Sequence, residues 1–204
     1  MPKILEGIEE RVIKVADKLF STYFYLNVET RMIAKESGVS VGTLYNYFPT
    51  KQDIFLAVVD RKFEKIEIEL GKSLNGKDKF EEKMYLYISK LYQLTEKSMK
   101  LHRSLTYLFI IEDEVVLKHS QNVHAKFQNL MRNTLFPVIS EEYPTITEED
   151  VRKILTVMRA SILFFIRRPS RKKEDDKKDI EMLYGILMDF LKNDKNYLKG
   201  ENNV

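Results

Sequence analysis

The side chains with the clearest binding chemistry lie between positions 41 and 47 of this 204-residue chain. They supply hydroxyl, phenol and amide groups, and no Cys, His, Asp or Glu stands among them. Such groups form hydrogen bonds to base edges and to phosphate oxygens. Carried by one exposed short helix, they would suit a nucleic-acid groove and its flanking phosphates. The residues are Val41, Gly42, Thr43, Tyr45, Asn46 and Tyr47.

Catalytic and metal chemistry has little support elsewhere in the chain. There is no cysteine, which removes disulfides, thiolate nucleophiles and Cys-based zinc sites together. The densest acids beside an apolar run are Glu112, Asp113 and Glu114, which we interpret as solvated residues that cap or break a helix. No Ser/His/Asp order, glycine-rich phosphate loop or metal-ligand spacing occurs. We therefore predict that the protein is not an enzyme and has neither a metal site nor a cofactor.

Composition indicates an ordinary globular protein. Apolar residues make up 44% and charged residues 32%, and the net charge of +3 is too weak to argue for nucleic acid by itself. The start of the chain has no apolar core of signal-peptide length. The longest apolar run, at residues 161–166, is far shorter than the roughly 20 residues that a membrane span needs. These features predict a cytoplasmic protein without membrane spans.

The polar residues at 41–47 need helices to position them, and local signals predict those helices. Apolar residues at i, i+3, i+4, i+7 and i+8 predict a first helix over about 8–22, and a second, short helix follows at 31–37. Gly38 stands where a helix ends in a left-handed conformation, and Ser40 is a good N-cap for a third helix over 41–48. The apolar positions of the first helix are Val12, Val15, Ala16, Leu19 and Phe20.

A fourth helix is predicted directly after Pro49, because a residue that precedes proline resists the α conformation. Thr50 and Asp53 form an [ST]-x-x-[DE] capping pattern at its start. The best boundary candidate is the stretch 71–79, with two glycines and mixed charges. A short helix, a tight turn with glycine and a second short helix form the helix-turn-helix arrangement. We expect Leu44 and Phe48 to be core residues of this unit.

The segment "IAKESGVSVGTLYNYFPTKQDIFLAVV" resembles the N-terminal domain of TetR-type transcriptional regulators. The resemblance covers about a quarter of the chain. It implies an all-α fold with an N-terminal helix-turn-helix domain at residues 1–52, extended by the first part of a connecting helix to about 70. The remaining residues, 53–204, would form a larger helical domain for ligand binding and dimerisation. This sequence departs from the family at Phe24, where glycine is usual, and at Val41, where Lys, Ser or Pro is frequent.

The resemblance also implies roles for single residues. Thr43, Tyr47 and Lys51 would contact backbone phosphates, and Val41, Gly42 and Tyr45 would lie nearest the base edges. Asn46 could pair with adenine if it faces inward. Because the third helix has no Arg or Lys, we expect modest direct readout and a dependence on DNA shape. The predicted DNA-binding set is completed by residues at the starts of the second and third helices: Thr30, Arg31 and Ser40.

The second half of the chain is rich in aromatic residues and methionine at helical spacing. These residues either fill a helical core or line a cavity for a small apolar or aromatic molecule, and the sequence does not separate the two. A proline at 137 should kink or end a helix. The charged stretch 167–179 is interpreted as a solvated connector. The candidate pocket residues are Tyr85, Tyr92, Met99, His102, Tyr107, His124, Phe127 and Met131.

The last two predicted helices carry more apolar surface than one core needs. The final helix has one apolar stripe through Leu183 and Leu187 and a second through Met182, Ile186 and Phe190. Two stripes imply a second partner, and the economical one is another copy of the chain. Pairing these helices across a two-fold axis would give a four-helix interface. The predicted interface residues are Met158, Ile162, Phe165, Leu183, Ile186, Leu187 and Phe190.

Together these patterns favour a homodimeric regulator that binds double-stranded operator DNA and that a small molecule releases from it. The alternative is a helical adaptor that binds another protein through its C-terminal helices. The sequence identifies neither the ligand, nor the operator, nor the regulated genes, and it does not distinguish repression from activation.

Overall fold

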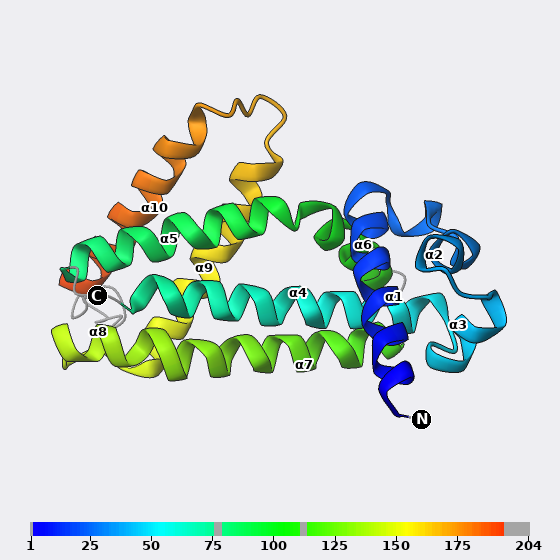
Figure 1. Cartoon of the computed structure of the whole chain (residues 1–204). Helices are drawn as coiled ribbons and strands as arrows, with labels where there is room; N and C mark the ends of the chain where they lie inside the picture. The colour runs from blue at the N-terminus through cyan, green and yellow to red at the C-terminus, as the bar shows by residue number, and fades with distance from the viewer. Residues whose placement is uncertain (1, 76–78, 111–113, 194–204) are drawn as a thin grey trace. The chain divides into compact units, whose positions relative to one another are not determined.

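The structure is a computed structural model that describes residues 2–75, 79–110 and 114–193. Within these residues the secondary structure is helical, with ten α-helices and no strand (Figure 1). The all-α fold predicted from helical spacing is therefore confirmed. The chain divides into two compact units, one of residues 1–65 with 97–124 and one of residues 66–96 with 125–204. The assignment of DNA binding to residues 1–52 and of ligand binding to residues 53–204 stays a prediction.

Unit 1 contains the N-terminal helices and a later pair that packs with them. The stripe predicted for the first helix is buried at Val12, Ala16, Leu19 and Phe20, and Val15 is half-buried. It packs in one apolar core with residues of the later helices. The elements are α1 (Pro2–Thr22), the 3₁₀ turn η1 (Tyr25–Asn27), α2 (Thr30–Ser37), α3 (Val41–Tyr47), α4 (Lys51–Leu74, its first part), α6 (Met99–Ile110) and α7 (Glu114–Leu130, its first part).

The connection from α1 to α2 explains why this chain does not need the glycine that is usual near position 24. Phe24 has an extended backbone, with φ −69° and ψ 149°, which any residue adopts. Its ring meets the ring of Tyr107 edge-on, with centroids 5.5 Å apart. The next residue, Tyr25, is buried; its ring stacks on Phe20 and meets the ring of Phe55 edge-on. Aromatic packing therefore shapes this turn.

Unit 2 is a second set of packed helices. Thr147 and Asp150 form a reciprocal capping box at the start of α9. Pro137 stands in the first turn of α8, and a π-helical segment precedes it, so the predicted break in the helix is confirmed. The elements are the second part of α4, α5 (Phe80–Lys97), the end of α7, the π-helix η2 (Met131–Leu135), α8 (Phe136–Glu142), α9 (Glu148–Arg167) and α10 (Asp175–Lys192).

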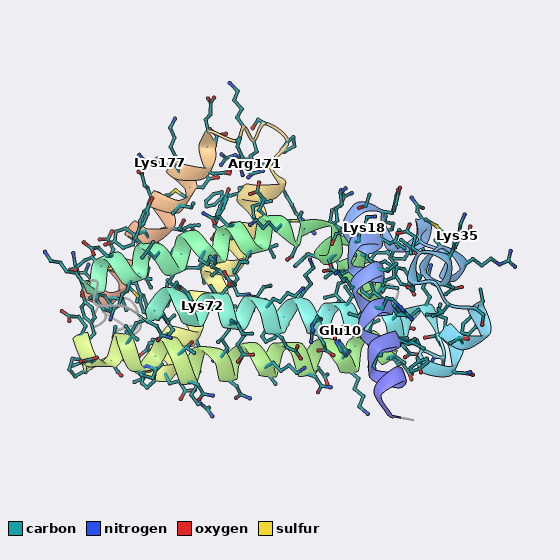
Figure 2. All side chains as sticks on the ribbon, viewed as in Figure 1. Glu10, Lys18, Lys35, Lys72, Arg171 and Lys177 are labelled. Carbon is teal, nitrogen blue, oxygen red and sulfur yellow. The ribbon has the colours of Figure 1, made fainter. Side chains whose placement is uncertain are left out.

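The charged stretch between α9 and α10 is not the solvated connector that its composition predicted. Arg171, labelled in Figure 2 in this stretch, bonds to Glu96 of α5 and to Asp176, both at 2.6 Å. Asp179 is buried, and it accepts from the Tyr92 hydroxyl at 2.9 Å and from the Arg168 guanidinium at 2.9 Å. These bonds tie the α9–α10 connection to α5.

The electrostatics of this network follow from its contacts. Burial and the hydrogen bond to Asp179 raise the pKa of the Tyr92 hydroxyl above its ordinary range. Burial opposes ionisation of Glu96 and Asp176, but hydrogen bonds from Lys173 and Arg171 outweigh it and lower the pKa of each carboxyl. Both carboxylates are therefore ionised at neutral pH and are held by cations, which makes this network a stabilising part of unit 2.

Candidate nucleic-acid interface

The turn between α2 and α3 has the geometry that its sequence predicted. Gly38 lies in the left-handed region with φ 65° and ψ 34°, where a Cβ atom would be strained. The Val39 N–H donates to the Ala34 carbonyl at 3.0 Å, which closes the end of α2. Ala34 is fully buried where the two short helices pack. The chain therefore reverses within three residues and begins α3 at a defined angle to α2.

Ser40 is the N-cap of α3. Its Oγ accepts a hydrogen bond from the Thr43 N–H at 2.9 Å and lies 2.8 Å from the Thr43 hydroxyl. At the other end Phe48 is the C-cap, and Thr50 and Asp53 form a second capping box at the start of α4, with hydrogen bonds of 2.9 and 3.1 Å. Local hydrogen bonds thus hold both ends of α3. A helix of only seven residues depends on such bonds, because helices this short are marginally stable by themselves.

The α3 helix buries little of itself. Leu44 is its one buried residue, and Phe48 follows it into the core, as predicted for both. Gly42, Tyr45 and Asn46 are exposed. Val41, Thr43 and Tyr47 are half-buried, and the side chains of Val41 and Tyr47 pack against the core of unit 1. The predicted reading face is therefore solvent-accessible in this structure.

The start of α2 and the N-cap of α3 carry three further residues of the predicted DNA-binding set. Arg31 and Ser40 are exposed and Thr30 is half-buried. The hydroxyls of Thr30 and Tyr45 lie 3.3 Å apart, so the start of α2 and the middle of α3 are joined by a side-chain hydrogen bond. A ligand seated on α3 would thus also meet the first turn of α2. The predicted DNA roles of these residues stay predictions.

Lys51, which was predicted to contact a phosphate, also makes contacts inside unit 1, and its DNA role stays a prediction. Its ammonium donates to the carbonyl oxygens of Tyr25 and Val28, both at 3.1 Å, and lies 4.3 Å from the centroid of the Tyr25 ring. Burial lowers the pKa of this ammonium, and Glu29 partly opposes that change. Sequence reasoning missed these contacts, because they join residues 23 and 26 positions apart.

The residues predicted for a ligand pocket divide between the two units. Tyr85 and Tyr92 belong to unit 2, where the Tyr85 ring meets Tyr184 edge-on at 5.6 Å. Met99, His102 and Tyr107 belong to unit 1, all half-buried. The side chains of the other three, His124, Phe127 and Met131, lie outside the described part of the chain.

Most of the residues predicted for a dimer interface are buried in the core of the protomer. Phe165 is half-buried, Ile186 is exposed, and the other five, Met158, Ile162, Leu183, Leu187 and Phe190, are buried. The second stripe of α10 nevertheless faces solvent at Met182 and Ile186, and α9 adds Val157 and Phe164. These exposed apolar groups on both helices could contact the predicted second copy of the chain, and the interface stays a prediction.

The described residues also bear on metal binding, on the acids considered for catalysis and on membrane spans. Among them, no group of three or more His, Asp or Glu side chains could hold a metal ion. Of the acids considered for catalysis, Glu112 and Asp113 lie outside the described residues, and Glu114 begins α7 exposed to solvent. No helix in the described ranges is long and apolar enough to cross a membrane.

The geometry of α2, the turn and α3 defines a helix-turn-helix protein, and comparison with known proteins gives its family. Residues 12–58 match the family model described as bacterial regulatory proteins, tetR family. The nucleoid occlusion factor SlmA of Glaesserella parasuis is 30% identical over 145 residues, which cover 65% of this chain and 69% of that protein. The chain therefore belongs to the tetR family of bacterial regulatory proteins, as its motif predicted.

One further relative and one solved structure extend the comparison. The transcriptional repressor KstR of Rhodococcus jostii is 31% identical over 104 residues, which are 51% of this chain and about half, 48%, of that repressor. The crystal structure of Thermus thermophilus FadR, a repressor in complex with lauroyl-CoA, superposes with a TM-score of 0.64 at 21% identity and covers 88% of this chain and 93% of that one. The second likeness shows the fold alone.

Proposed function

We propose that the protein is a dimeric DNA-binding transcriptional repressor that a small molecule releases from its operator. The observation that carries this proposal is the exposed face of α3, which is capped at both ends and set by the Gly38 turn. Two such helices in one dimer would enter successive major grooves roughly 34–36 Å apart on a near-palindromic site. Because its target would be chromosomal DNA, we expect the protein to act in the cytoplasm.

On this proposal the residues of α2 and α3 divide into two groups. Arg31, Thr43 and Tyr47 would hold phosphate oxygens, and Gly42, Tyr45 and Asn46 would meet base edges. A Cβ atom at Gly42 would stand 3.8 Å from its nearest neighbour, the Ser40 Oγ, so space inside the protein does not require glycine there. Close approach of the backbone to DNA is a reason for glycine at this position that the proposed function supplies.

The ligand would act through its different affinities for two dimer geometries, one of which has the wrong spacing for the operator. Its class is the finer part of the proposal. The aromatic and apolar residues of the C-terminal helices suit an apolar molecule. Lauroyl-CoA is the first compound to test, because a FadR repressor of the same fold was solved with it.

Gel-shift and footprinting with the DNA upstream of the protein's own coding sequence test the proposal. We expect protected half-sites about one helical turn apart and an affinity that falls with salt by about 0.9 log unit per log unit of salt for each phosphate contact. Binding that shows no sequence preference with or without acyl-CoA would contradict it. Sedimentation tests the adaptor alternative, because a monomer at micromolar concentration would leave Phe164 and Ile186 to a foreign partner.

A further inference from the structure

Three segments of unit 1 that are distant in sequence meet at the η1 turn. From one side, the Lys51 ammonium at the start of α4 holds the carbonyl oxygens of Tyr25 and Val28, each at 3.1 Å. From another, the Tyr25 N–H donates to the Oγ of Ser104 in α6 at 3.1 Å. Ser104 is fully buried, and it is one of the few polar side chains that are buried among the described residues. The turn is therefore fixed by α4 and by α6 together.

This turn sets where α2 begins. Val28 is the C-cap of η1, and its carbonyl stands two residues before Thr30, the first residue of α2. The Glu29 carbonyl then accepts the first helical bonds of α2, from Met32 at 3.0 Å and Ile33 at 3.3 Å. A shift of Val28 would therefore move the first turn of α2. The hydrogen bond between Thr30 and Tyr45 would pass that movement to α3.

We propose that Lys51 and Ser104 are positioning residues for DNA binding, which hold the η1 turn so that the start of α2 and the face of α3 meet the same duplex. This inference rests on the proposed function. For Lys51, this role inside the protein replaces the phosphate contact that its position in the motif implies. Ser104 belongs to no motif, and it receives the same positioning role.

The environment of Lys51 supports the assignment. An ammonium has three N–H donors, and two of them are used by the carbonyls while the charge faces the Tyr25 ring. The third N–H is not used by these carbonyls, so the salt slope has to decide whether this ammonium also neutralises a phosphate. Lys51 is half-buried, and this burial lowers the pKa of its ammonium. Ser104, fully buried, does not reach a phosphate at all.

The expected size of the effect follows from a two-state turn. If losing the contact leaves both turns of the dimer correctly placed in about a tenth of the dimers, the apparent operator affinity falls about tenfold, because only that fraction is competent to bind. A positioning residue changes this fraction without changing the number of phosphates that the complex neutralises. The salt slope therefore separates the two roles of Lys51, since a true phosphate contact contributes about 0.9 to that slope.

The test measures operator affinity at several salt concentrations for the full-length protein and for Lys51→Met and Ser104→Ala. Two variants serve as matched controls. Lys65→Met removes an exposed lysine from the same α4 helix. Thr106→Ala removes a hydroxyl from the same α6 helix, where it donates within the helix to the His102 carbonyl at 2.9 Å. Hydrogen exchange of the Tyr25 and Val28 amides is measured on the free proteins, and thermal unfolding confirms that each variant is folded.

We expect Lys51→Met and Ser104→Ala to bind about tenfold more weakly with the parent salt slope, and both controls to bind within about twofold of the parent. The Tyr25 amide should exchange faster in Ser104→Ala and the Val28 amide faster in Lys51→Met. The inference is overturned if Lys51→Met lowers the slope by about 1.8 units, about 0.9 for the Lys51 of each protomer, while Ser104→Ala binds like the parent. If the parent itself binds no operator, the proposed function fails, and unchanged amide exchange in both variants would refute the turn contacts separately.

Discussion

Ser40 offers a substitution pair that separates the folding of α3 from its contact with DNA. Ser40→Ala removes the hydrogen bond that the Thr43 N–H donates at 2.9 Å, whereas Ser40→Asp keeps a capping oxygen in that place. Losing an N-cap costs about 1 kcal/mol of stability. For a chain of this length that lowers the unfolding temperature by about 2–4 °C. Asp is as good an N-cap as Ser, so Ser40→Asp should unfold close to the parent temperature.

Ser40→Asp should be the more stable of the two variants but the weaker in DNA binding. Ser40 is exposed at the start of α3, so a carboxylate there would stand against the phosphates of the proposed complex. Juxtaposed like charges cost several kcal/mol, and each 1.4 kcal/mol is tenfold in affinity, so Ser40→Asp should bind operator at least about a hundredfold more weakly. Ser40→Ala introduces no charge and should lose roughly tenfold or less, through fraying of the helix and loss of the Ser40 hydroxyl.

Thr147 is the matched control in unit 2. It caps α9 in the same way, with the Asp150 N–H donating to its hydroxyl at 3.2 Å. Thr147→Ala should lower stability by about the same 1 kcal/mol, and Thr147→Asp should leave operator affinity unchanged. Differential scanning fluorimetry and fluorescence anisotropy with labelled operator supply both measurements. If Ser40→Asp binds operator as well as Ser40→Ala does, the N-terminus of α3 does not face DNA and the reasoning is refuted.

Three further predictions concern unit 2. Arg171→Met should lower the free energy of unfolding by about 2 kcal/mol in urea titrations, because it removes one of the two cations that pair with the partly buried Glu96 and Asp176 and leaves them with Lys173. Arg152→Met, at an exposed pair, should cost less than about 1 kcal/mol, and equal effects would contradict the network. The pKa values of Glu96 and Asp176 are lowered in the folded protein, so these carboxylates stabilise it at pH values above their ordinary pKa values of 4.5 and 3.8. This stability is lost as pH falls through the folded pKa values. The decrease of unfolding free energy with falling pH should therefore be shallower in Arg171→Met than in the parent, and parallel curves would refute this. Phe164→Glu should convert the dimer to monomer in sedimentation, because it places a charge in the proposed apolar interface, and an unchanged mass would exclude α9 from that interface.

The parts of this fold that sequence predicted are those governed by neighbouring residues. Gly38, Ser40 and the Thr50–Asp53 box each act within four residues of their partner, so spacing alone identifies them. The core positions Leu44 and Phe48 follow from helical periodicity in the same way. Local chemistry of this kind therefore indicated the helix-turn-helix and its family without any structure.

The parts that sequence could not predict depend on residues brought together by packing. Lys51 looked like a solvated cation in a binding motif, because nothing in the sequence shows that the Tyr25 carbonyl comes within 3.1 Å of it. Tyr92 was predicted to line a pocket, and nothing in the sequence shows that its hydroxyl donates to Asp179, 87 positions away. Arg171 was interpreted as part of a solvated connector for the same reason. Composition does not separate an ion pair across 75 residues from a solvated charge.

The central claim, that the exposed face of α3 enters duplex DNA, can be tested at one residue. The chain has no cysteine, so Asn46→Cys gives a unique thiol on the exposed face of α3 for a DNA-cleaving iron chelate. The same reagent on Lys177→Cys, an exposed position of α10, is the control. We predict cleavage from position 46 at two sites about one helical turn apart, at the centres of the two half-sites, and none from position 177. Operator that is bound but uncut from position 46 would contradict the account.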